Sequence, residues 1–299
     1  MIRYYNRVTR NVETEKVYGG SYLEWAYRSA IGFFLTDHFF SKRWLSRLFG
    51  AYEDSLLSRS KIEDFISRYG IDMGDFEEAQ YACFNDFFIR KFKPGKRPFS
   101  RSERDICAGA EARYLVFPDL KPSQTFAVKG MEIDLEELLG DAALARGFEG
   151  GCMILARLCP VDYHRFHFPF SGLLTRHYRV AGALHSVNPV AIESVPRVFL
   201  KNERQVAIME HPKIGMSAMI EVGALGVGKI VQSAYSERTP LPLKFEKGLE
   251  KGYFLFGGST VIWLFQKEKF KLAQDLLENS ARGLETWVPL GQPLGELIE

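Results

Sequence analysis

The hydrophobic pattern of the chain changes near residue 100. Residues 21–50 place aromatic and aliphatic side chains at helical spacing, and residues 62–92 continue with helical periodicity. Cations are interspersed with the apolar positions of the first stretch, at Arg28, Lys42, Arg43 and Arg47. This spacing predicts amphipathic helices. A basic turn marked by proline and glycine at residues 93–98 then ends the helical region.

After residue 105 the apolar runs become short and are separated by glycine and proline, which is typical of strands. The predicted strands are residues 114–117, 153–156, 218–222 and 261–265, and the predicted short helices are residues 134–139 and 269–277. The expected fold class is therefore α+β. We expect a helical amino-terminal region at residues 1–100 and a β-rich catalytic domain at residues 101–299.

The aromatic helices have two interpretations. A helix with large aromatic side chains opposite Lys and Arg suits the headgroup layer of a bilayer, whereas amphipathic helices more often pack on their own domain. The run of cations at residues 90–97 is similarly ambiguous between contact with lipid phosphates and a solvated face. The longest early apolar stretch, residues 29–36, has 8 residues, and a membrane span needs about 20.

Composition and charge narrow the function only slightly. The chain is 46% hydrophobic, and its 39 basic and 37 acidic side chains give a net charge of +2, which does not indicate nucleic acid as a partner. The four cysteines show no CxxC pair, so we expect them to be reduced and buried. The first residues carry charge without a following apolar run, so no secretory signal is expected.

Two segments carry candidate chemistry. His164 and His167 lie in an aromatic run at residues 162–169, where partial burial would suit general acid and base roles better than a metal site; structural histidines are the alternative. Gly257 and Gly258 precede Ser259 in a hydrophobic hairpin predicted over residues 253–265. Glycines leave a carbonyl unshielded, so the Ser259 hydroxyl could approach the carbonyl carbon of Gly258. The alternative interpretation is a simple turn.

Taken together, these motifs resemble those of phosphatidylserine decarboxylases over about residues 80–295. The resemblance is carried by Phe-Phe-Ile-Arg at residues 87–90, Asp-Tyr-His-Arg-Phe-His at residues 162–167, Gly-Ala at residues 223–224 and Gly-Gly-Ser-Thr at residues 257–260. It implies self-cleavage between Gly258 and Ser259. The products would be a β chain of residues 1–258 and an α chain of 299 − 258 = 41 residues that begins with a pyruvoyl group derived from Ser259.

The resemblance also implies roles for the site residues. Ser259, His167 and a carboxylate would perform self-cleavage, and His164 would reprotonate the substrate carbon. Phosphatidylserine would form a Schiff base with the pyruvoyl group and leave as phosphatidylethanolamine and CO2, without a metal. Glu111 stands where the family usually has aspartate, which leaves slow or incomplete self-cleavage open, because a shift of about an ångström can cost roughly 100-fold in rate. Asp105 is the alternative acid.

The expected partners are phosphatidylserine, an anionic membrane surface, the two chains of one precursor and a second copy in a homodimer, with no nucleic acid. The expected location is peripheral, at the cytoplasmic face of a membrane. Two alternatives remain open. The chain could be a poorly processed or inactive relative that binds anionic membranes, or it could decarboxylate another amino-acid headgroup or a soluble amine precursor.

Overall fold

The structure is a computed structural model that describes residues 2–125, 131–225, 229–257 and 259–298. Its largest element within these ranges is a ten-stranded sheet. The strands follow in the spatial order β13 (Leu243–Phe245), β9 (Gly172–Val180), β10 (Arg204–His211), β11 (Gly215–Val222), β15 (Ser259–Phe265), β7 (Cys152–Leu158), β4 (Ala112–Pro118), β17 (Glu285–Val288), β1 (Arg3–Asn6) and β2 (Asn11–Thr14). Neighbours pair antiparallel except β1 and β17, which are parallel.

Smaller sheets and short helices surround this sheet. The smaller sheets are β12 (Ile230–Gln232), β14 (Glu250–Phe254) and β8 (Arg165–His167); β16 (Phe270–Leu272), β18 (Pro293–Leu297) and β3 (Asp105–Cys107); and β5 (Ser123–Thr125) with β6 (Glu132–Asp134). The helices of this part are α6 (Leu135–Leu139), α7 (Ala142–Arg146), α8 (Pro189–Ser194), α9 (Val198–Lys201) and α10 (Gln274–Ala281). The protein is thus of mixed α and β class with large sheets.

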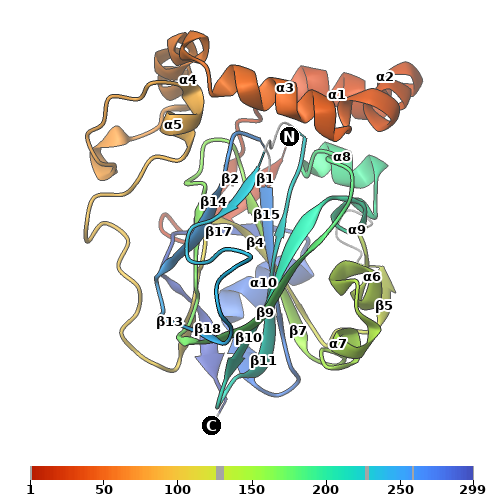
Figure 1. Ribbon diagram of the computed structural model, residues 1–299, viewed down its shortest axis with the longest axis vertical. Helices are drawn as coiled ribbons and strands as arrows, with labels where there is room; N and C mark the ends of the chain where they lie inside the picture. The colour runs from red at the N-terminus through yellow and green to blue at the C-terminus, as the bar shows by residue number, and fades with distance from the viewer. Residues whose placement is uncertain (1, 126–130, 226–228, 258, 299) are drawn as a thin grey trace.

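The amino-terminal helices form a layer across one end of the sheets (Figure 1). They are α1 (Gly20–Arg28), α2 (Ala30–Leu35), the π-helical turn η1 (Thr36–Phe40), α3 (Arg43–Glu53), η2 (Leu56–Ser60), α4 (Lys61–Tyr69), η3 (Met73–Asp75) and α5 (Phe84–Phe88). We call residues 20–88 the helical layer. Among the described residues, no helix is long and apolar enough to cross a bilayer.

The predicted elements are largely present, with three differences. The four predicted strands and the helix near residue 135 are confirmed. In the segment predicted as one helix from residue 269, β16 comes first, because Phe270 and Leu272 alternate inward, and α10 follows. Residues 76–83 are not helical, since Phe76 forms an isolated β-bridge with Phe92. The chain also begins with β1 and β2, which belong to the large sheet.

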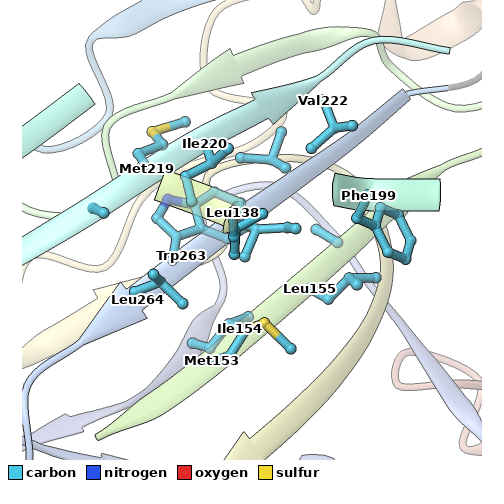
Figure 2. Packing of buried hydrophobic residues seen from close by; sticks show 14 of the residues in the cluster. Leu138, Met153, Ile154, Leu155, Phe199, Met219, Ile220, Val222, Trp263 and Leu264 are labelled. Carbon is cyan, nitrogen blue, oxygen red and sulfur yellow. The ribbon is translucent and has the colours of Figure 1, made fainter. Parts of the chain in front are cut away.

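The core lies on the central strands β7, β11 and β15. Figure 2 shows Met153, Ile220 and Trp263 packing with Leu138 of α6 and Phe199 of α9. All seven residues of β15 are buried, as expected for a strand with both faces covered. Truncating a buried Trp or Phe in such a core costs about 3–5 kcal/mol. The four cysteines are buried and free, as expected.

The segment before Ser259 connects two different sheets. β14 pairs with β12 and β8, whereas β15 pairs with β7 and β11. The predicted hairpin over residues 253–265 is therefore wrong. The reason is burial, because β15 is covered on both faces at the centre of the large sheet, while β14 belongs to the small one. Gly257 has φ 146°, a conformation that favours glycine, where the chain passes between the sheets.

Candidate active site

Ser259 is the first residue of β15, opposite Leu158 of β7. Its side chain is completely buried, and within the described part of the chain its hydroxyl oxygen has no hydrogen-bond partner. A buried hydroxyl without a partner costs about 1–3 kcal/mol, so this position calls for an explanation by function. Gly258, the other half of the expected cleavage site, lies outside the described residues.

His164 is buried in its neutral form. Its Nδ1 lies 3.0 Å from the carbonyl oxygen of Asp162, which can only accept, so Nδ1 carries the hydrogen. Its Nε2 is then unprotonated, and among the described residues it has no partner. Burial lowers the pKa of His164 to about 3, so the ring stays neutral at physiological pH. His164 therefore offers one free proton acceptor inside the protein.

His164 lies beside the segment that leads to Ser259. Its backbone carbonyl accepts a hydrogen bond of 2.9 Å from the backbone N–H of Phe254. Its ring packs on Phe88 with centroids 3.9 Å apart, and Phe88 in turn packs edge-on against Phe256, 5.2 Å away. The structure thus connects His164 with the last described residues before the expected cleavage site.

His167 is the last residue of β8 in the small sheet. It stands opposite Glu250 on β14, about 10 Å beyond His164 at the usual rise of a strand. Its Nδ1 donates to the carbonyl oxygen of Gly248 at 2.9 Å, and its Nε2 lies 3.3 Å from the hydroxyl of Tyr163. Burial lowers the pKa of His167, so this ring is also a neutral base.

Glu111 is buried against a cation. Its Oε2 accepts a 2.6 Å hydrogen bond from Nε of Arg97, and the backbone N–H of Leu290 lies 3.4 Å from the same oxygen. Burial raises the pKa of Glu111, and the Arg97 guanidinium opposes that rise. Of the described residues, no hydrogen bond joins Glu111 to His167. The alternative acid, Asp105, accepts from the Ser100 hydroxyl instead.

Two cations of the run at residues 90–97 make contacts inside the protein. Arg90 is 2% exposed and stacks between Phe76 and Phe87. Its guanidinium donates to the carbonyl oxygens of Val161 and Asp162, at 2.9 and 3.3 Å, and so supports the turn before His164. Arg97 is held by Glu111 and by Asp75 at 2.9 Å. Neither of the two interpretations, phosphate contact or a solvated face, therefore describes Arg90 and Arg97, because both side chains satisfy internal acceptors.

A cavity of about 540 Å³ lies between the helical layer and the sheets and reaches Gly257. Its outer wall is aromatic and apolar, formed by Tyr18, Tyr22, Leu23, Phe40 and Phe49. Its inner wall includes Leu158, Pro160, Val187, Leu225 and Phe256. Polar side chains are also present, namely Lys16, Glu53, Ser186, Asn188 and the ion-paired Glu15 and Arg157. A mostly apolar cavity with a few polar groups is typical of a ligand site.

Several residues of this site were not predicted from the sequence. Tyr163 is the partner of His167, and Arg97 is the partner of Glu111. Asn85 accepts a hydrogen bond from the backbone of Phe256, in the segment before Ser259. Asn85 was detectable in principle as an amide within the aromatic run at residues 84–88. The cavity walls come from segments far apart in the chain, so no local pattern indicated them.

The fold and the site are those of an enzyme with a buried internal serine beside a ligand-sized cavity. The sequence profile described as phosphatidylserine decarboxylase matches residues 84–295, more than half of the chain. The chain belongs to the phosphatidylserine decarboxylase family, which confirms the resemblance seen in its motifs.

Curated relatives named phosphatidylserine decarboxylase proenzyme match nearly the full length. One from Clostridium botulinum (strain 657 / Type Ba4) is 40% identical over 297 residues, and one from Clostridium perfringens (strain ATCC 13124) is 38% identical over 297 residues. A third, from Clostridium kluyveri, is 37% identical over the same length. Each alignment covers 99% of this chain and 99% of the relative. The match includes the amino-terminal hundred residues as well as the β-rich part.

The residues present suit the pyruvoyl group of this family. The group would replace Ser259, whose hydroxyl is buried without a described partner. A free imidazole nitrogen, Nε2 of His164, is available in the same region, and the cavity reaches the adjacent Gly257. The word proenzyme in the names of the relatives fits such processing.

Proposed function

We propose that this chain cuts itself between Gly258 and Ser259 and then converts phosphatidylserine to phosphatidylethanolamine and CO2. The main observation in support is the cavity, which extends from its aromatic outer wall to Gly257. A lipid whose tails enter between the helices would bring its headgroup to the residue that follows Gly258. Family membership supplies the reaction, and the cavity supplies a path for this substrate.

Self-cleavage begins with attack of the Ser259 hydroxyl on the carbonyl carbon of Gly258, which needs a base to take the proton. We propose His167 as that base, since burial keeps it neutral. In this proposal Glu111 does not contact His167 but acts through the electrostatic effect of its carboxylate on Tyr163. Burial and, more weakly, the Glu250 and Glu111 carboxylates raise the pKa of Tyr163, so its phenol stays protonated next to Nε2 of His167. To receive the Ser259 proton, His167 must release this phenol.

His164 is the second candidate for this base. Its Nε2 is already free, and its backbone is hydrogen-bonded to Phe254, so it needs no exchange of partner. The two histidines make different predictions for processing, which are compared in the Discussion.

In turnover the pyruvoyl group supplies an electron sink for the pair released when the carboxylate leaves. We assign the proton transfers to His164. Its Nδ1 hydrogen is fixed on the Asp162 carbonyl, so Nε2 alone can take a proton from the substrate ammonium and later return it to the α-carbon. One proton is taken and one is returned. Arg90 supports this arrangement because it donates to the same carbonyl at 3.3 Å.

Different parts of the cavity lining suit different parts of a phospholipid. The aromatic outer wall suits acyl chains, and the polar side chains nearer Arg157 suit a headgroup that carries an ammonium, a carboxylate and a phosphate. Lys16 is the exposed lysine of the lining and is placed to meet the phosphate. The short helix α8 contributes Asn188, whose side chain already caps it at Val190.

We further propose that the helical layer docks on the surface of an anionic membrane at its cytoplasmic face. Its exposed large apolar side chains are Tyr22, Trp25, Ile31, Phe34, Phe39, Trp44, Leu48, Phe49, Tyr52, Leu56 and Leu57. Lys42 and Arg47 are exposed beside them. An apolar surface of this size flanked by cations suits the headgroup layer. Homodimer formation stays a prediction.

The decisive experiment combines mass and activity. The purified protein should give two chains by intact mass, the smaller with 41 residues and a blocked amino terminus, because a pyruvoyl group has no amine. The same sample should convert phosphatidylserine in vesicles to phosphatidylethanolamine. An unsplit, inactive chain that still binds vesicles would favour the membrane-binding alternative, and turnover of a soluble amine precursor in preference to lipid would overturn the substrate assignment.

A further inference from the structure

Asn85 connects the helical layer to the segment that precedes the cleavage site. It lies on α5 and is 2% exposed. Its Oδ1 accepts a 2.7 Å hydrogen bond from the backbone N–H of Phe256, and its Nδ2 donates a 2.7 Å hydrogen bond to Oδ1 of Asp54. Asp54 caps the end of α3. One buried amide therefore holds Phe256, two residues before Gly258, at a fixed distance from two helices.

The Phe256 ring is held by the same layer and by Tyr18, which precedes it. It packs edge-on against Tyr18, Phe84 and Phe88, with centroids 5.6, 5.1 and 5.2 Å away. The ammonium of Lys61 lies 5.5 Å from its centroid. Phe256 follows the end of β14, so these aromatic contacts and the Asn85 hydrogen bond replace the support of a strand.

The residue on the other side of the cleavable bond is held by the large sheet. Ser259 is paired with Leu158 of β7, and the next residue, Thr260, with Val222 of β11. The two sides of the Gly258–Ser259 bond are thus anchored to different parts of the molecule. Their relative position depends on how the helical layer sits on the sheets, and Asn85 is the side chain of the layer that hydrogen-bonds to the segment before Gly258.

We propose that Asn85 is a positioning residue for self-cleavage, which holds the chain before Gly258 so that its carbonyl lies within reach of the Ser259 hydroxyl. The inference rests on the self-cleavage proposed above and extends it to the helical layer, whose role then includes processing as well as lipid binding. A misplacement of about 1 Å between reacting groups can cost roughly 100-fold in rate. Asparagine suits the position because it accepts and donates at once, whereas aspartate only accepts.

The test measures the rate at which newly made chain splits, by pulse-labelled cell-free synthesis followed by gel separation of the two products. Asn85→Ala should slow splitting roughly 10- to 100-fold. Asn85→Asp should also slow it, because two carboxylates then face each other. The exchange Asn85→Asp with Asp54→Asn should restore the rate, since Asn at position 54 can donate to Asp at position 85, which still accepts from Phe256.

Asn279→Ala is the matched control. Asn279 is a buried asparagine on α10 that donates a 3.0 Å hydrogen bond to Thr286, away from the helical layer. Its loss should lower the melting temperature, as Asn85→Ala also does, but leave splitting at the wild-type rate. Unchanged splitting in Asn85→Ala, or equal slowing in Asn279→Ala, would overturn the inference alone. A wild-type chain that never splits would overturn the proposed self-cleavage together with it.

Discussion

The first helices of the layer, residues 20–57, expose many of their large apolar side chains, whereas the β-rich part of the molecule buries most of its own. In the layer, Ile31, Trp44 and Leu48 are 72%, 56% and 59% exposed. In the sheets, Trp263 and Phe166 are 1% and 0% exposed, and the side chains of Ser259 and His164, which we propose to be catalytic, are completely buried. The first helices thus present apolar surface to the outside, and the β-rich part encloses polar side chains.

The two regions therefore have different physical requirements. A helix that exposes aromatic residues in water loses about 25 cal/mol for each Å² of apolar surface left uncovered, so the layer needs another apolar phase. A buried histidine or serine needs a dry site, where its proton affinity can be controlled. The cavity lies where the two regions meet, and the predictions below test this division, from the largest expected effect to the smallest.

Ser259→Ala should abolish splitting and decarboxylation together, because alanine has no hydroxyl to attack the Gly258 carbonyl or to become the pyruvoyl group. Intact mass and release of CO2 from phosphatidylserine measure the two losses. Ser217→Ala is the control, since Ser217 is a fully buried serine on the neighbouring strand β11. Splitting by the Ser259→Ala variant would refute the assignment of the cleavage site.

His164→Ala should leave splitting largely intact and lower decarboxylation about 10²- to 10⁴-fold, the usual contribution of a general acid or base. His167→Ala should instead slow splitting. Time courses of chain separation and of CO2 release on the processed fraction give the two rates. If His164→Ala blocks splitting and His167→Ala does not, the base of self-cleavage is His164, as its free Nε2 allows. Full turnover by His164→Ala would remove it from the decarboxylation step.

Replacing Phe34, Trp44 and Leu48 together with serine should weaken binding to phosphatidylserine-containing vesicles at least about tenfold, because each large apolar side chain contributes on the order of 1 kcal/mol or more when covered. Cosedimentation measures the binding. The matched control replaces Leu173, Leu241 and Ile298, which are exposed apolar residues outside the layer. Equal losses for both triple variants would break the comparison between the regions.

Stability should fall with acid through His164. Its folded pKa of about 3 lies below the ordinary value of 6.5, so below pH 6.5 the unfolded chain binds a proton that the folded chain does not. This contribution is complete above pH 6.5 and declines by at most about 1.4 kcal/mol per pH unit toward pH 3. Urea unfolding in the unsplit Ser259→Ala background measures the slope. Adding His164→Gln should make it shallower, and an unchanged slope would contradict the buried, neutral histidine.

The sequence predicted the local elements and the chemistry well where a short pattern is sufficient. Alternating or continuous apolar runs predicted the strands that became β4, β7, β11 and β15. The motif around Ser259 indicated the family, which the comparisons confirm. Helical spacing also predicted the aromatic helices, but the same spacing fits a core helix and a membrane-facing one, so it did not reveal which way the aromatic residues point.

Only the tertiary structure decided the partners of these residues. The hydrophobic segments before and after Ser259 suggested one hairpin, yet burial on both faces places β15 at the centre of the large sheet and leaves β14 in a small one. The resemblance implied that Glu111 would act with His167, and the structure shows the Glu111 carboxylate in an ion pair with Arg97. The proposed partners of Ser259, such as His167 and Asn85, come from distant segments of the chain, and long-range packing sets their distances.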